Sequence, residues 1–163
     1  MIVVSDTTPL ISLMKIDRLS LVRDLFGEIL IPQAVFDELT SDPRFPIESR
    51  MIADAGYIRC EDIQDYAYVD LLRRASGLDA GESEAILLCD SKKADLLLMD
   101  EVKGRQVARQ MGLTVMGTIG MLMAAYDSAL LSRAEIEECI RILKENGRHI
   151  SELLYQQLMD RLR

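Results

Sequence analysis

A chain of 163 residues is close to the size of one compact domain, and 49% hydrophobic with 28% charged residues excludes disordered, collagen-like and disulfide-dominated classes. The single histidine, His149, leaves little basis for a Ser-His-Asp hydrolase, and the HExxH zinc enzymes are excluded. The formal net charge of −8 comes from 27 acidic against 19 basic residues, a balance suited to a hard, oxygen-binding cation such as Mg²⁺ or Mn²⁺.

Short aliphatic runs alternate with helical patterns along the whole chain. The predicted strands are 1–5, 28–31, 57–60, 95–99 and 113–116. The predicted helices are 9–16, 19–26, 32–41, 47–55, 63–75, 79–93, 101–111, one that begins at Thr118, 132–146 and 151–162. Strands that alternate with helices favour a parallel sheet covered on both faces. We therefore expect an α/β fold, a three-layer α/β/α sandwich with a short, mostly parallel sheet of about five strands. One domain spans 1–130, and a helical extension, 131–163, packs on it.

No segment is predicted to direct the chain to a membrane. The longest apolar stretch, 111–126, contains three glycines and is shorter than the roughly 20 residues that span a bilayer. The N-terminus reaches an acid at Asp6 before any long apolar core develops, which is not typical of a secretion signal. We expect a cytoplasmic protein.

Two acids follow predicted strands directly. Asp6 comes after the first strand, and Asp100 comes after the apolar run DLLLM. Ligands of open parallel sheets bind at the carboxyl ends of the strands, where the topology changes direction. Asp6 and Asp100 would therefore face one crevice if their strands are neighbours.

Helical phase adds two further acids. Glu38 lies at the edge of the apolar stripe of its helix, whereas Asp37 lies on the opposite side. On the next acidic helix Glu82 lies within about 40° of the stripe centre and Glu84 about 120° from it. We therefore expect Glu38 and Glu82 to point inward.

Each acid also has a purely structural interpretation. Asp79 and Glu82 in DAGE have the spacing of a capping box, and Asp6 and Asp100 each precede a predicted helix that they could cap. Capping does not require the acids to converge. Four carboxylates in one crevice would raise each other's pKa unless a multivalent cation neutralised them, so convergence would indicate a metal site.

Five segments together resemble the PIN-domain nucleases, and within them a prokaryotic branch that occurs beside small antitoxin proteins. They are VVSDTTPLISL around Asp6, ILIPQAVFDEL (29–39), LDAGESEAILL (78–88), LLLMDEVKGRQVA (96–108) and GLTVMGTIGML (112–122). The tail ILKENGRHISELLYQQL resembles the C-terminal helices of the same branch. The resemblance implies a PIN-like nuclease domain over 1–130 and maps the acidic quartet of the family onto Asp6, Glu38, Glu82 and Asp100.

The third and fourth positions depart from the commonest pattern of the family. Many PIN toxins open the relevant helix with an Asp in a DA pattern, whereas here Glu82 stands in GESEA and Glu84 is the nearer match. Asp100 stands directly at the strand end, while many members place this acid a few residues later. Both Glu82 and Glu84 therefore remain candidates for the third acid.

The resemblance implies metal-dependent hydrolysis of RNA phosphodiester bonds by the toxin of a toxin–antitoxin pair. Mg²⁺ or Mn²⁺ would be held by Asp6, Glu82 and Asp100. Segment 92–109 has five basic and three acidic residues, so we expect salt-sensitive binding of single-stranded or structured RNA there. The candidate phosphate contacts are Lys103, Arg105, Arg109 and Thr118, with a helix cap as the alternative for Thr118.

Two further expectations concern binding partners. The partners implied are RNA, a small antitoxin protein and a second copy of the chain, because many apolar residues at 121–125 and in the last two helices suggest a homodimer. The alternative function is a catalytically weak or inactive PIN-like protein-binding module whose acidic crevice binds a basic partner.

Overall fold

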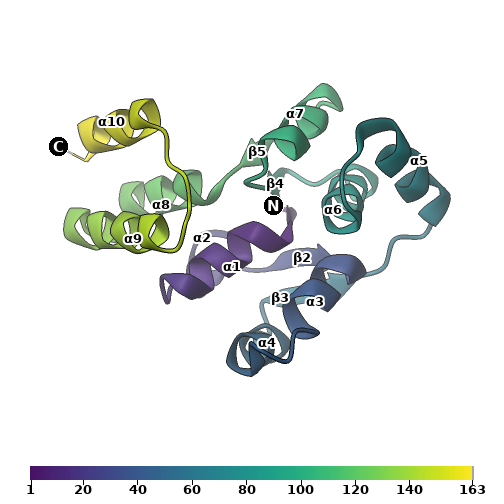
Figure 1. Cartoon of the computed structure of the whole chain (residues 1–163), viewed down its shortest axis with the longest axis horizontal. Coiled ribbons are helices and arrows are strands. Elements are labelled where there is room, and N and C mark those ends of the chain that lie inside the picture. The colour runs from purple at the N-terminus through teal and green to yellow at the C-terminus, as the bar shows by residue number, and fades with distance from the viewer. Residues whose placement is uncertain (163) are drawn as a thin grey trace.

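The computed structural model describes residues 1–162, and its centre is one five-stranded parallel sheet (Figure 1). The strands are β1 (Val3–Ser5), β2 (Ile29–Pro32), β3 (Ile58–Glu61), β4 (Leu96–Leu98) and β5 (Val115–Met116). Their order is β3-β2-β1-β4-β5, and every neighbouring pair is parallel. The predicted α/β fold with a parallel sheet of five strands is confirmed.

Ten helices connect and follow the strands within the described part of the chain. They are α1 (Thr7–Lys15), α2 (Leu21–Phe26), α3 (Gln33–Thr40), α4 (Pro46–Asp54), α5 (Tyr66–Ser76), α6 (Ala80–Ser91), α7 (Val102–Gln110), α8 (Thr118–Asp127), α9 (Arg133–Glu145) and α10 (Glu152–Arg161). The predicted elements all occur, and they differ mainly at their ends. The last predicted strand, 113–116, shortens to Val115–Met116 because only these residues pair with β4.

Alternating strand residues separate the interior into two hydrophobic layers. Val3, Leu96 and Leu98 face one layer with helices α1, α2, α8 and α9. Val4 and Leu97 face the other layer with α6 and α7. Because both faces of the central strands are covered, they consist of buried residues throughout.

The strand order changes direction beside β1. The chain runs from β1 outward through β2 to β3 and then returns to place β4 on the other side of β1. Ser5 is in register with Leu98, so the residues that follow β1 and β4 leave the sheet at the same edge. This edge is the switch point at which parallel sheets bind ligands.

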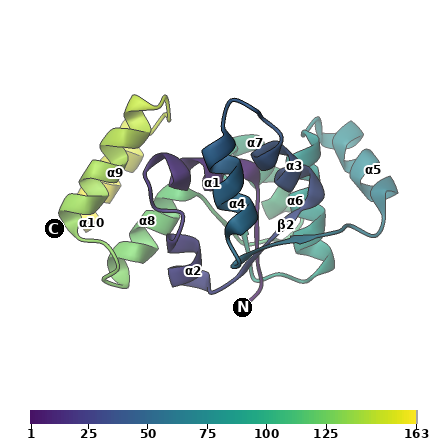
Figure 2. The same ribbon diagram turned by 90° about the horizontal axis from the view of Figure 1, so that it is seen from below.

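The C-terminal helices complete the hydrophobic layer that contains α1. Helix α9 buries Ile136, Cys139, Ile140 and Leu143 in that layer. In both ribbon views α9 and α10 lie together at one end of the molecule, with α5 at the other end (Figures 1 and 2). The segment after residue 131 therefore shares a core with the rest of the chain.

Burial within the chain accounts for most of the apolar residues that suggested a homodimer. Met121, Leu122 and Ala125 of α8 are fully buried, and Leu158 of α10 is 3% exposed. Among the apolar side chains of α10, Leu153 stays largely exposed at 70%. The homodimer remains a prediction and now depends on fewer residues.

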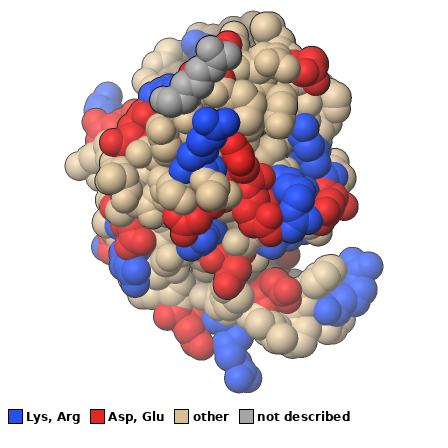
Figure 3. Space-filling view, turned by 90° about the vertical axis from the view of Figure 1, so that its left-hand side faces the viewer, with Lys and Arg blue, Asp and Glu red and all other residues tan. Residues whose placement is uncertain are grey.

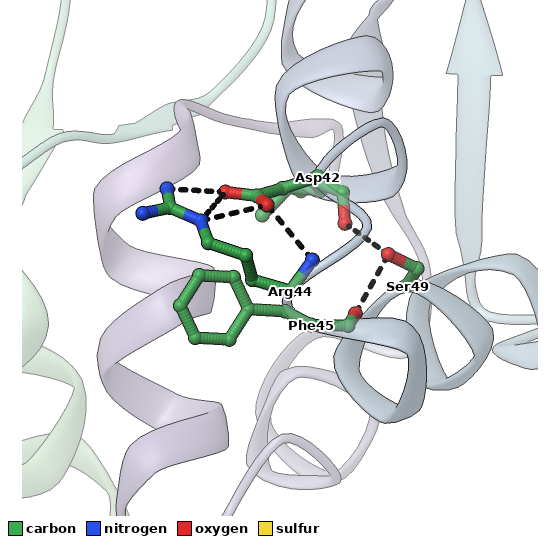
Figure 4. Close-up of polar contacts among 5 residues, drawn as sticks. Asp42, Arg44, Phe45 and Ser49 are labelled. Carbon is green, nitrogen blue, oxygen red and sulfur yellow. Dashed lines mark hydrogen bonds and ion pairs between the residues drawn. The ribbon is translucent and has the colours of Figure 1, made fainter.

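A short loop fixes the end of α3, the helix that carries Glu38 (Figure 4). Asp42 accepts hydrogen bonds from the backbone N–H and the guanidinium of Arg44, which lowers the pKa of Asp42 to about 2. The Arg44 guanidinium lies 5.5 Å from the centre of the Phe45 ring. The Ser49 hydroxyl then donates to the carbonyls of Leu39 and Phe45, which ties α4 to the last turn of α3.

Ile140 tests whether α9 is part of the main core. We expect Ile140→Ala to lower the free energy of unfolding by about 2–5 kcal/mol, because the residue is 2% exposed and its removal leaves a cavity. The matched control is Leu153→Ala, which should change stability by less than about 0.5 kcal/mol since this side chain is exposed. Urea denaturation measures both, and an Ile140→Ala variant as stable as the control would contradict the shared core.

Candidate active site

Asp6 and Asp100 lie at the same edge of the sheet, as the strand-end argument predicts. The backbone N–H of Asp6 donates to the carbonyl of Leu98 at 2.9 Å, so the pairing of β1 with β4 continues to the first acid. Asp100 follows two residues after Leu98. Asp6 is 4% exposed, whereas Asp100 is partly exposed.

Asp6 and Glu38 converge above Gly81, in the first turn of α6. A methyl group in place of the Gly81 hydrogen would collide with Oε1 of Glu38 and would lie 3.6 Å from Oδ1 of Asp6. A side chain at position 81 would therefore require the Glu38 carboxylate to shift from its place beside Asp6. Glu38 points inward as the helical phase predicts, while Asp37 accepts a hydrogen bond from Gln33 on the exposed side.

Burial and like charges both act on this carboxylate pair. Burial raises the pKa of Asp6 from 3.8 to about 7, and the charges of Glu82, Asp79 and Glu38 add to the rise. The pKa of Glu38 is also raised, first by partial burial and then by Asp79, Glu82 and Glu84. The site therefore favours either a bound proton or a bound cation at neutral pH.

Glu82 both caps helix α6 and lies near the carboxylates of the acidic crevice. Its carboxylate accepts a hydrogen bond from the Asp79 N–H at 2.9 Å, and Asp79 accepts one from the Glu82 N–H at 2.8 Å. This is the capping box of α6. Glu82 is also the acid whose charge contributes most to the raised pKa of Asp6. It therefore lies beside the pair, with its carboxylate turned toward the helix start.

Glu84 is buried, contrary to the prediction that it lies away from the interior. It is 4% exposed and accepts a hydrogen bond from the Ala34 N–H at 3.0 Å, in the first turn of α3. Helix α6 is covered on more than one side, so no single apolar stripe defines its inner face and the helical wheel does not predict the burial of Glu84. Glu84 satisfies the N-terminus of α3 and holds this helix against α6.

Asp79 also belongs to the acidic crevice, although the sequence suggested only a capping role for it. It contributes to the raised pKa of both Asp6 and Glu38. Asp79 precedes the first turn of α6 and was therefore outside the helical wheel. The sequence feature that could have indicated this position is Gly81, two residues later, because a glycine in the first turn of a helix lets neighbouring carboxylates approach it.

Asp100 is held by the start of α8. Its two carboxylate oxygens accept hydrogen bonds from the N–H of Thr118 at 2.7 Å and from the hydroxyl of Thr118 at 2.6 Å. Gly117 leaves room for this arrangement, since a methyl group there would lie 2.5 Å from Arg105 Nη1 and 2.9 Å from Asp100 Oδ1. The hydroxyl of Thr118 therefore orients Asp100.

The three basic candidates of α7 divide between two sides. Arg105 and Arg109, one helical turn apart, line a groove next to Asp100. Lys103 instead extends toward Gly77, the C-cap residue of α5. Residues 103 and 105 differ by about 200° around the helix, so they cannot face the same ligand surface.

The donor atoms of the crevice suit a hard divalent cation. Asp6, Glu38, Asp79 and Glu82 supply only carboxylate oxygens, the ligand type of Mg²⁺ and Mn²⁺. Among residues 1–162 no group of three His, Cys, Asp or Glu side chains is already arranged to hold a metal. The Asp6 and Glu38 pair fits the ion, and Glu82 would have to release the Asp79 N–H to join it.

The variant Asp6→Asn tests whether the Asp6 carboxylate is buried, because burial makes the free energy of unfolding depend on pH. Because the folded-state pKa of Asp6 lies above 3.8, its contribution to stability is fully present below about pH 3.8 and is lost as pH rises through about 7. Asn cannot ionise and escapes this loss. We expect metal-free Asp6→Asn to be more stable than wild type at pH 8 by roughly 4 kcal/mol, at about 1.4 kcal/mol per pKa unit.

The difference should shrink toward zero near pH 3.5, and denaturant unfolding in EDTA at the two pH values measures it. Equal stabilities of the two proteins at pH 8 would mean that Asp6 is ionised at little cost.

Comparison with known proteins agrees with this geometry. None of the described helices is both long and apolar enough to cross a membrane. A search of curated proteins finds no match to the chain. A family model described as a PIN domain matches residues 2–163, including the C-terminal helices. PIN domains have a nuclease fold, and PIN nucleases typically use divalent metal ions. With its parallel sheet and its acids at the switch point, the chain belongs to the PIN-domain family.

Proposed function

We propose that this protein is a metal-dependent endoribonuclease that hydrolyses RNA phosphodiester bonds with Mg²⁺ or Mn²⁺. The observation that supports this function best is the convergence of Asp6 and Glu38 above Gly81 in a PIN domain. A buried carboxylate with a pKa raised to about 7 is poorly stabilised by its own protein surroundings. A divalent cation in the crevice would offset that charge and lower the free-energy cost of ionising Asp6.

In this proposal the chain positions the reacting groups and the cation supplies the electrostatics. When bound, Mg²⁺ or Mn²⁺ activates water and offsets charge on the phosphate. Asp6 and Glu38 would hold the ion, Glu82 would join them, and Asp100 would face the same crevice in the orientation set by Thr118. Arg105, between Asp100 and the groove, contacts the phosphate of the substrate.

The biological role proposed is the toxin of a toxin–antitoxin pair. The order of the five PIN-like segments and the tail ILKENGRHISELLYQQL support this role. A small antitoxin protein is the proposed partner. RNA cleavage in the cell would then depend on the fraction of the protein that is bound to that partner.

One observation favours a different function. Both oxygens of Asp100 and one oxygen of Glu82 already accept hydrogen bonds from the chain itself. A PIN-like module with these acids engaged could bind a basic side chain of a partner in its crevice without cleaving RNA. Metal-dependent cleavage separates this alternative from the nuclease.

A nuclease assay with and without Mn²⁺ tests the proposed function directly. We expect RNA cleavage only with the ion, and a fall in rate of about 100-fold or more for Asp6→Asn, because one preorganised charge at a reacting centre is worth this much. The matched control is Asp37→Asn, the neighbour of Glu38 on the exposed side of α3, which should keep the wild-type rate. Absence of cleavage by wild type under all metal conditions would favour the binding module.

Gly81→Ala tests the carboxylate geometry without removing any acid. The added methyl group would displace Glu38 from Asp6, so we expect the cleavage rate and the Mn²⁺ affinity to fall by about 10–100-fold. Stability should not fall, since alanine favours a helix over glycine by roughly 0.5–1 kcal/mol. Gly56→Ala is the control, because nothing lies within 4 Å of a methyl group there. Full activity of Gly81→Ala would exclude Glu38 from the site.

A further inference from the structure

A groove of about 1010 Å³ lies beside the acidic crevice, with Asp100 in its wall. One side is formed by α7 and the start of α8, and the other by the turn 147–151 and α10. The groove therefore joins two segments that are about forty residues apart in the sequence. Its volume lies at the upper end of the range of about 300–1,000 Å³ that is typical of ligand pockets, so it has room for part of a polymer.

The wall of this groove carries more basic than acidic side chains, although the protein has a net charge of −8. On the end of the molecule that carries α9 and α10, basic and acidic side chains are intermingled (Figure 3). The wall contains Arg105 and Arg109 from α7 and Arg148 and His149 from the turn. A further arginine of the wall, Arg161, is neutralised by an ion pair with an aspartate of α8. Among the described residues no ion pair is formed by Arg105, Arg109 or Arg148. No carboxylate of residues 1–162 at ion-pair distance therefore neutralises these three guanidinium groups, and within the same range Arg148 has a hydrogen bond only to a backbone carbonyl.

Two features of the groove favour an oxygen-rich anion. The N-terminus of α8 faces it through Ile119 and Gly120, whose N–H groups belong to the first turn and have no partner within the helix. The Arg148 guanidinium reaches the same region, since it donates to the carbonyl of Thr8 at 3.4 Å.

The composition of the wall indicates how a polymer would be held. No Phe, Tyr or Trp among the described residues lines the groove, and its apolar members include Val102, Ile150 and Leu154. Stacking of bases is therefore confined to the imidazole of His149, and affinity would come mainly from contacts with a charged backbone. Asp100 lines the groove and leaves the sheet at the same edge as Asp6, so a strand that lies in the groove passes beside that acid.

We propose that single-stranded RNA lies in this groove on its way to the active site, with Arg109, Arg148 and His149 on its phosphates. The choice of RNA rests on the proposed nuclease function. The turn between α9 and α10 thereby becomes part of the substrate-binding surface, on the side of the strand opposite α7. Binding should be sensitive to salt and tolerant of sequence.

Arg148→Ala and Arg109→Ala test the proposal with a short fluorescent single-stranded RNA, measured by anisotropy in EDTA so that no cleavage occurs. We expect each variant to bind several-fold more weakly than wild type. Its plot of log affinity against log salt, taken between about 50 and 200 mM, should be shallower by about 0.7 for each phosphate that the variant no longer neutralises. Arg148→Lys should retain most of the slope because it keeps the charge.

Arg50→Ala is the matched control, since Arg50 is exposed on α4, away from the groove. Wild-type affinity and slope for Arg148→Ala would overturn the proposal, and so would failure of the wild type to bind RNA. Binding of a poly-glutamate peptide, instead of RNA, in an Arg148-dependent manner would assign the groove to an acidic protein segment and would also overturn it.

The outcomes separate this inference from the proposed function. Arg148-dependent RNA binding without Mn²⁺-dependent cleavage would leave the groove assigned and the nuclease proposal rejected. Cleavage by wild type with an unchanged salt slope and KM for Arg148→Ala would leave the nuclease and reject the groove.

Discussion

The repulsion between carboxylates at the end of β1 is the constraint on which the candidate site depends. Asp6 is almost fully buried, and Glu38, Asp79 and Glu82 all act on it with the same sign of charge. Such an arrangement opposes folding unless a proton or a cation is bound. The fold maintains it because the acids come from three packed parts of the chain, the end of β1, helix α3 and the capping box of α6. Asp6 extends the β1 and β4 pairing, and α3 is fixed at its start by Glu84 and at its end by Ser49.

The hydrophobic layers supply the stability that this crowding removes. Strand residues Val4 and Leu97 are completely buried between helices on one face, as Leu98 is on the other. Burial of each such side chain contributes about 1.5–3 kcal/mol. The acids lie just beyond the last strand residues, where the rigid sheet ends and where solvent and a ligand can enter. Rigid support beneath a charged, partly open crevice is what a preorganised site requires.

The sequence predicted the features that depend on local order and failed where packing decides. Strand ends identified Asp6 and Asp100, and helical phase identified Glu38, because one edge of a parallel sheet and one stripe of a helix govern these positions. The same phase argument was wrong for Glu84, since α6 is covered on several sides. The groove could not be predicted, because Arg148 meets the Thr8 carbonyl across 140 residues of chain and only the tertiary structure brings them together.

The two C-terminal helices contribute unequally, and this bears on how a strand could enter the groove. Helix α9 buries four residues in the main core, whereas α10 buries Leu158, with Leu162 just after it. Segments with few buried apolar contacts separate from the core at lower free energy than the global unfolding reaction. Arg148 and His149 lie at the junction, next to the firmly packed α9. The basic side chains of the turn are therefore supported mainly by α9, the better packed of the two C-terminal helices.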